Sequence, residues 1–143
     1  MRIPYCLALV LFAVVLAGCD GPRERRIKII DKFEARIKNA IDGKVLQDWA
    51  NDAICKYNVG DSIPEETFPS CFTNVMDHGY QPYCYLIKST EGDKCLDITW
   101  RWFYGQAGIV IGVENKDFTV DWLKDGMGSR YLSTNLIIYI GTD

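Results

Sequence analysis

Three carboxylates in the second half of the chain are the residues best suited to acid–base chemistry. Asp97, Glu114 and Asp121 fall in segments where apolar and polar residues alternate, as they do in half-buried strands. Two carboxylates that face each other across neighbouring strands have the chemistry of a glycosidase pair. Because nothing in the spacing requires these side chains to converge, a small carboxylate-dependent hydrolase is an alternative and not our main prediction.

The other catalytic side chains are isolated. His78 is the single histidine of the chain, and a catalytic base needs a partner that orients it. Asp77 is its neighbour in sequence only, and a turn residue before Gly79 explains His78 equally well. Motifs for a nucleophile elbow, a zinc protease or a phosphate loop do not occur. We therefore expect no enzymatic activity, no catalytic residue, no metal ion and no cofactor.

The first twenty residues have the order of a secretory signal. A positive charge at Arg2 and an apolar run over 3–15 precede Leu16-Ala17-Gly18-Cys19. This four-residue segment resembles the lipobox of bacterial lipoproteins. The resemblance implies that the Cys19 sulfur receives a diacylglyceryl group and that a peptidase removes residues 1–18 as a signal peptide. An ordinary signal peptide and an uncleaved membrane helix are the alternatives, although the run is shorter than the about 20 residues of a membrane span.

The same resemblance implies a location. A lipoprotein is exported and held at a membrane by its N-terminal lipid, where it faces the periplasm or the cell exterior. In Gram-negative members of the family, an aspartate after the lipid cysteine favours the inner membrane, and Asp20 is that residue here. We expect residues 19–23 to link the lipid to a single domain over 24–143.

Charge is unevenly distributed along the chain. Residues 22–44 contain eight basic and four acidic residues, whereas residues 45–143 contain seven basic and fourteen acidic residues. A basic stem therefore precedes an acidic domain. Since phosphate binding needs a basic face, this composition argues against a nucleic-acid partner.

Four cysteines remain after the signal peptide and Cys19 are set aside. Cys55, Cys71, Cys84 and Cys95 are an even number in an oxidising compartment, which favours two disulfides. A zinc site and free thiols are the alternatives. Zinc is disfavoured because no pair has the close C-x-x-C spacing of a metal site.

The stem has the spacing of an amphipathic helix over 24–41. Ile27, Ile30, Phe33, Ile37 and Ile41 recur every three or four residues, and basic residues lie opposite. The helix lies either on an anionic membrane surface or against the core of the domain, and we favour the core.

Helical spacing resumes over 45–57, so 24–57 forms either two helices or one long helix that includes Gly43. Residues 58–81 read as irregular, and apolar, β-branched and aromatic residues then predict strands at 82–89, 94–104, 108–114, 118–124 and 130–140. Short connections join antiparallel neighbours. The predicted fold class is α+β, with one or two N-terminal helices followed by an antiparallel meander of about five strands.

If the turn of the first predicted hairpin covers Thr90–Asp93, the pairing of residues on its two strands follows. Ile87 then faces Leu96, and Cys84 and Cys95 share a face about 13 Å apart, too far for a disulfide. We therefore expect each of them to bond with Cys55 or Cys71.

An aromatic cluster follows in the second strand. Trp100, Trp102 and Tyr104 share one face, which belongs either to the core or to a binding patch, because Trp, Tyr and Arg dominate protein interfaces. With no catalytic motif, we predict a lipid-anchored envelope protein that acts by binding, through its lipid at the membrane and through a protein partner. An inhibitor or immunity protein directed against an envelope-targeting enzyme is the alternative within this class, since an acidic face suits a basic target.

Overall fold

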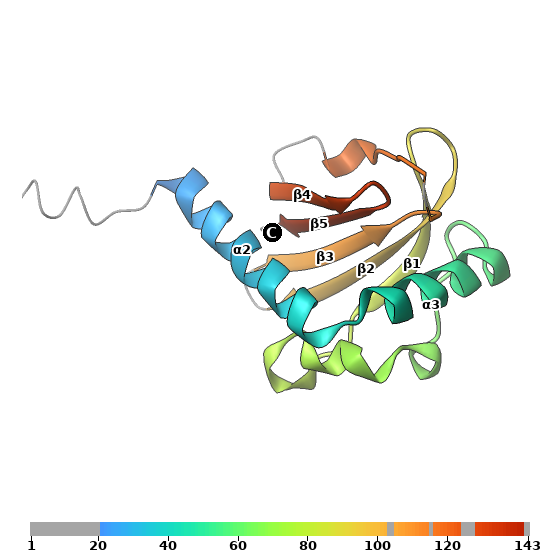
Figure 1. Ribbon diagram of the computed structural model, residues 1–143, viewed down its shortest axis with the longest axis horizontal. Coiled ribbons are helices and arrows are strands. Elements are labelled where there is room, and N and C mark those ends of the chain that lie inside the picture. Colours follow the sequence, from blue (N-terminus) through green and yellow to red (C-terminus); the bar gives the residue numbers. More distant parts are fainter. Residues whose placement is uncertain (1–20, 103–104, 115, 124–127, 142–143) are drawn as a thin grey trace, which may run out of the picture.

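The apolar stripe of the stem forms helix α2 (Pro22–Ala40), which packs against the sheet of an α+β domain in this computed structural model (Figure 1). The structure describes residues 21–102, 105–114, 116–123 and 128–141, although not the side chain of Trp102. The signal peptide, Cys19, Asp20 and Tyr104 lie outside the described residues. The predicted fold class is confirmed.

Helix α2 belongs to the core over its second half. Ile30, Phe33 and Ile37 are buried, whereas Ile27 is 45% exposed, and Figure 1 shows the first turns of α2 extending beyond the strands. The prediction that the stripe packs on the core is therefore right from Ile30 onward. The helix begins at Pro22, so the segment 19–23 that we expected to be a linker already includes the first helical residues.

An ion-pair cluster also ties α2 to the sheet. Arg130 of the edge strand β4 (Gly128–Ser133) donates from Nη1 to Glu34 at 2.5 Å and from Nη2 to Asp31 at 2.8 Å. Hydrogen bonds from Lys38, which has the larger effect, and from Arg130 lower the pKa of the Glu34 carboxyl below its usual range.

The chain turns between α2 and helix α3 (Gly43–Lys56), so residues 24–57 form two helices and not one long helix. Asp42 caps the start of α3. Its Oδ1 accepts hydrogen bonds from the backbone nitrogens of Lys44 at 2.9 Å and Val45 at 3.1 Å, as an N-cap residue does. At the other end of α3, Lys94 Nζ donates to the Tyr57 carbonyl at 2.8 Å. Three short 3-10 helices follow, η1 (Glu65–Thr67), η2 (Ser70–Asn74) and η3 (Asp77–Gly79).

Five antiparallel strands form one sheet in the order β1-β2-β3-β5-β4. The strands other than β4 are β1 (Tyr83–Lys88), β2 (Lys94–Trp102), β3 (Gly105–Ile111) and β5 (Leu136–Gly141). Two predicted strands were wrong. Residues 130–140 contain a turn at 134–135 and belong to both strands of the β4–β5 hairpin. Residues 118–124 form no strand where they are described, because Phe118, Val120 and Leu123 bury their side chains on the sheet instead of pairing with it.

The register of the first hairpin differs from the prediction by one residue. Ile87 pairs with Cys95, Tyr85 with Asp97 and Tyr83 with Thr99. The cause is the loop, which closes between Ser89 and Asp93 with a backbone hydrogen bond of 2.8 Å and turns through Gly92 at φ 94°. This three-residue loop with a left-handed glycine is one residue shorter than the turn we assumed.

The one-residue shift separates the two strand cysteines. Cys84 belongs to the core beneath the helices, whereas Cys95 belongs to a second apolar cluster on the opposite face. Neither predicted set of two disulfides is present in this structure, since each set needs Cys95 to bond with a cysteine of the helical half across the sheet. All four cysteines carry free thiols. Burial raises the pKa of Cys95 to about 12 and that of Cys84 further.

The contact between α2 and the sheet predicts a stability effect. Phe33 is 4% exposed, and its ring packs edge-on against Trp100 at a centroid distance of 6.0 Å. Phe33→Ala should lower the free energy of unfolding by about 3–5 kcal/mol, measured by urea denaturation. The matched control is Ile27→Ala on the exposed part of the same helix, which should change it by less than about 0.5 kcal/mol. Equal effects of the two substitutions would contradict the packing described here.

Candidate functional site

The sheet face opposite the helices is only partly covered. Phe118, Val120 and Leu123 pack there against the sheet residues Cys95 and Val110. Beside this cover lies a cavity of about 230 Å³, which we call the sheet-face pocket. The side chains that define it come from β1, β2, β5 and the short helix Asp121–Leu123: Tyr83, Tyr85, Asp97, Arg101, Trp122 and Tyr139.

The floor of the pocket depends on a glycine. Thr99, Gly108 and Tyr139 are aligned across β2, β3 and β5. A Cβ atom at Gly108 would lie only 2.4 Å from Cζ of Tyr139, so the tyrosine ring occupies the space that any other residue would fill. The ring therefore extends across β3 to the neighbouring strand, where its hydroxyl lies 2.5 Å from Oγ1 of Thr99.

Asp97 is the ionisable group at the floor. Its Oδ1 accepts hydrogen bonds from the Tyr139 hydroxyl at 2.8 Å and from Thr99 Oγ1 at 3.1 Å. Burial raises the pKa of Asp97 to about 6, against the opposing effects of these hydrogen bonds and of Arg101. Burial likewise raises the pKa of the Tyr139 hydroxyl, so it remains a hydrogen-bond donor. A cleft residue with a strongly shifted pKa is a candidate functional residue.

Exposed rings form the rim of the pocket. Tyr83, Tyr85 and Trp122 are 52%, 41% and 39% exposed. The Arg101 guanidinium lies 5.7 Å from the ring centroid of Tyr83, and Trp122 packs edge-on against Tyr139 at 5.0 Å. One acid, one base and several rings suit the binding of a small polar molecule or of a side chain from a partner.

The carboxylate pair of the alternative hydrolase hypothesis is not assembled in this pocket. Among the described residues that line the pocket, Asp97 is the only acid. Asp121 is exposed and accepts a hydrogen bond from Thr90 at 3.0 Å, and Glu114 is exposed in the connection after β3. His78 is exposed at φ 69°, and the neighbouring Asp77 accepts a hydrogen bond from Arg36 Nη2 at 2.9 Å. No group of three or more metal-ligating side chains occurs in the part of the chain that the structure describes.

Of the two alternatives for Trp100, the core is confirmed and the binding patch is wrong. This residue is fully buried beneath the helices, where it packs against Phe33 and Phe72. The side chain of Trp102 and the whole of Tyr104 lie outside the described residues. Sequence reasoning missed Tyr83 and Tyr85 because the predicted register placed them on the Trp100 face, whereas Arg101 shares a face of β2 with Asp97 in either register and nothing in its spacing marked it as a site residue. In the observed register, the alternation of β1 and β2 places all three with Asp97.

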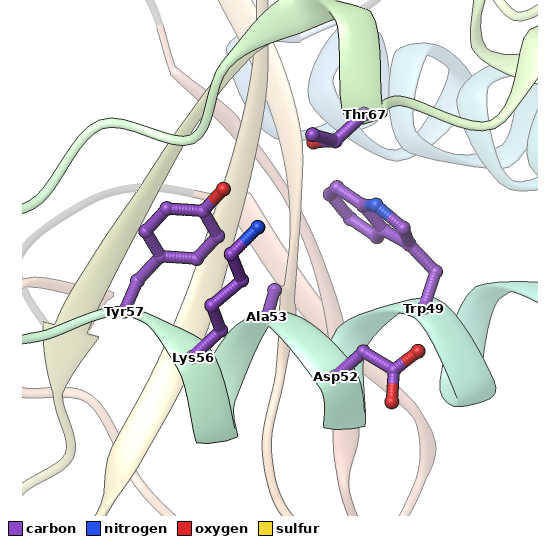
Figure 2. A pocket seen from close by; sticks show the side chains of 6 residues that line it. All are labelled: Trp49, Asp52, Ala53, Lys56, Tyr57 and Thr67. Carbon is purple, nitrogen blue, oxygen red and sulfur yellow. The ribbon is translucent and has the colours of Figure 1, made fainter.

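A second cavity, of about 400 Å³, lies between α3 and η1 (Figure 2). We call it the helix slot. It is lined by Trp49, Asp52, Ala53, Lys56, Tyr57 and Thr67. The described lining of the slot contains no histidine and one acid, Asp52. In Figure 2 the Asp52 carboxylate points away from the other polar groups, so no acid–base pair is positioned there.

Comparisons with protein-family models, with curated proteins and with solved structures find no match for this chain. Across the ranges that the structure describes, none of the helices has the length and apolar character needed to span a membrane.

The raised pKa of Asp97 predicts a pH dependence of stability. An unfolded aspartate has a pKa of about 3.9, whereas the folded value is about 6, so the folded state binds the proton more tightly. The contribution of Asp97 to the free energy of unfolding is therefore largest below about pH 4 and is lost as the pH rises through 6. Asp97→Asn keeps an oxygen acceptor but does not titrate. Relative to this variant, the wild-type free energy of unfolding should fall by about 2 kcal/mol between pH 4 and 7. A difference that stays constant with pH would contradict the shift.

Proposed function

We propose that this chain is a lipid-anchored protein of the cell envelope that acts by binding, with the sheet-face pocket as its binding site. The observation that supports this proposal is Asp97, a half-buried carboxylate beneath a rim of exposed aromatic rings. Burying a carboxylate is costly, and ring faces left open to water are typical of an interaction site. A ligand that covers the rings would compensate for both features.

Binding is favoured over hydrolysis by the number of acids in the pocket. A glycosidase needs two carboxylates on opposite sides of the bond that it cleaves, and the described pocket lining contains only Asp97. The two hydrogen bonds to its Oδ1 also hold the carboxylate in place. Asp97 and Arg101 give the pocket an acceptor and a donor of opposite charge, which favours a ligand that is neutral overall and offers both hydrogen-bonding functions.

The anchor would attach close to the folded domain. Cys19 is two residues before Gly21, and α2 begins at the next position. Two extended residues span at most about 7 Å, so a lipid on Cys19 would hold the start of α2 at the membrane surface.

Lipidation is tested by metabolic labelling. Cells that produce the protein and are fed labelled palmitate should incorporate the label, and Cys19→Ser should abolish both labelling and removal of residues 1–18. Cys55→Ser is the matched control, since Cys55 is an exposed cysteine of the folded domain, and it should leave labelling unchanged. Labelling that persists in Cys19→Ser would rule out the anchor.

The binding site is tested by placing a photo-crosslinking amino acid at Tyr85 and, as a control, at Lys44. Both positions are exposed, but Lys44 lies on α3. In intact cells, Tyr85 should yield a discrete adduct that Lys44 does not, and Arg101→Ala should reduce its yield. The absence of an adduct at Tyr85, or hydrolysis of envelope polymers that is lost in Asp97→Asn with the melting temperature unchanged, would overturn the proposal.

A further inference from the structure

We propose that the helix slot binds an extended, proline-rich peptide segment of a partner protein, with lysine or arginine beside the prolines. This site is distinct from the sheet-face pocket, and its test does not depend on lipidation or on that pocket.

The walls of the slot come from one face of α3 and the residue that follows it. Trp49, Ala53 and Tyr57 are spaced four residues apart, so they lie on one side of the helix. The methyl group of Ala53 leaves a gap between the two rings (Figure 2). The wall residues are about 12 Å apart along the axis at 1.5 Å per residue, the length of about four residues of polyproline II at 3.1 Å each.

The polar groups that face this gap are mainly donors. Figure 2 shows the indole nitrogen of Trp49, the ammonium of Lys56 and the hydroxyl of Tyr57 turned toward the space between α3 and η1. None of these three groups donates a hydrogen bond to any residue that the structure describes. Thr67 contributes an oxygen that can accept, since its hydroxyl donates to the Pro64 carbonyl at 2.8 Å.

The rim of the slot is acidic. Asp52 lines it on α3, and η1, which supplies Thr67, also carries the exposed carboxylates of Glu65 and Glu66. Lys56 is the only base that lines the described slot, and its ammonium lies 5.2 Å from the Tyr57 ring centroid. The lining itself contains one acid and one base, and the exposed Glu65 and Glu66 beside Thr67 add negative charge outside the slot, so charge disfavours an anionic ligand.

A proline-rich segment satisfies both conditions. Proline has a carbonyl acceptor but no backbone N–H, so such a segment can accept from the slot without leaving donors unpaired. Its rings pack on aromatic walls, and its preformed extended helix loses little entropy on binding. Flanking lysine or arginine residues would pair with the acidic rim.

The probe is an acetylated and amidated peptide of six prolines followed by two lysines, added to the purified protein. We expect saturable shifts of the Trp49 indole N–H resonance in ¹⁵N NMR spectra, assigned with Trp49→Phe. The resonance of Trp122, in the sheet-face pocket, should not move. A peptide with glycine and serine in place of the prolines carries the same charge and should bind at least tenfold more weakly.

Two slot variants and one control test the assignment. Tyr57→Ala removes a wall and should weaken binding at least tenfold. Tyr57→Phe removes only the hydroxyl and should weaken it about threefold to tenfold, the effect of one hydrogen bond, and it serves as the test if the alanine variant does not fold. Asp48→Ala removes an exposed acid of α3 that pairs with Lys44 outside the slot and should change affinity less than twofold. No shift at millimolar peptide, equal binding of the glycine–serine peptide, or unchanged affinity of the Tyr57 variants would overturn the proposal.

Discussion

The loop between β1 and β2 determines which side chains each face of the sheet presents. Ser89 and Asp93 close it with a backbone hydrogen bond, and Gly92 turns through a left-handed conformation that other residues seldom adopt. Because side chains alternate along a strand, one residue more or less in this loop would exchange the two faces of β1 relative to β2. The observed length places Cys84 and Leu86 with Trp100 beneath the helices and places Tyr83, Tyr85 and Asp97 together on the other face.

The two faces of the sheet therefore differ in what covers them. The helix face is filled by an edge-to-face series of rings, from Phe33 through Trp100 and Phe72 to Trp49. The opposite face has a smaller apolar cluster and, beside it, the only large carboxylate pKa increase found in the described residues, at Asp97. The two cavities therefore lie on opposite sides of the sheet, one on its open face and one behind α3, so that occupation of one does not obstruct the other.

The sequence was informative where periodicity was long and unbroken. The stripe from Ile30 to Ile41 predicted the buried face of α2, and the strand-rich second half predicted an antiparallel sheet. Prediction failed where one local geometry decided a distant outcome. The length of the Ser89–Asp93 loop changed the register, and with it the faces of the sheet on which Tyr83, Tyr85 and Cys84 lie relative to Asp97 and Cys95. Gly108 is the clearest such case, because the sequence shows a glycine but not the Tyr139 ring that fills its place.

Arg130 has a mechanical consequence. It joins α2 to β4, the edge strand of the sheet, through two carboxylates one helical turn apart. Tension applied at the N-terminus would run along α2, and the buried contacts of Ile30, Phe33 and Ile37 would resist it over the length of the helix. The ion pairs would pass part of that tension to β4, whose hydrogen bonds to β5 act in parallel. A domain pulled from this end would therefore resist as one body instead of shedding its first helix.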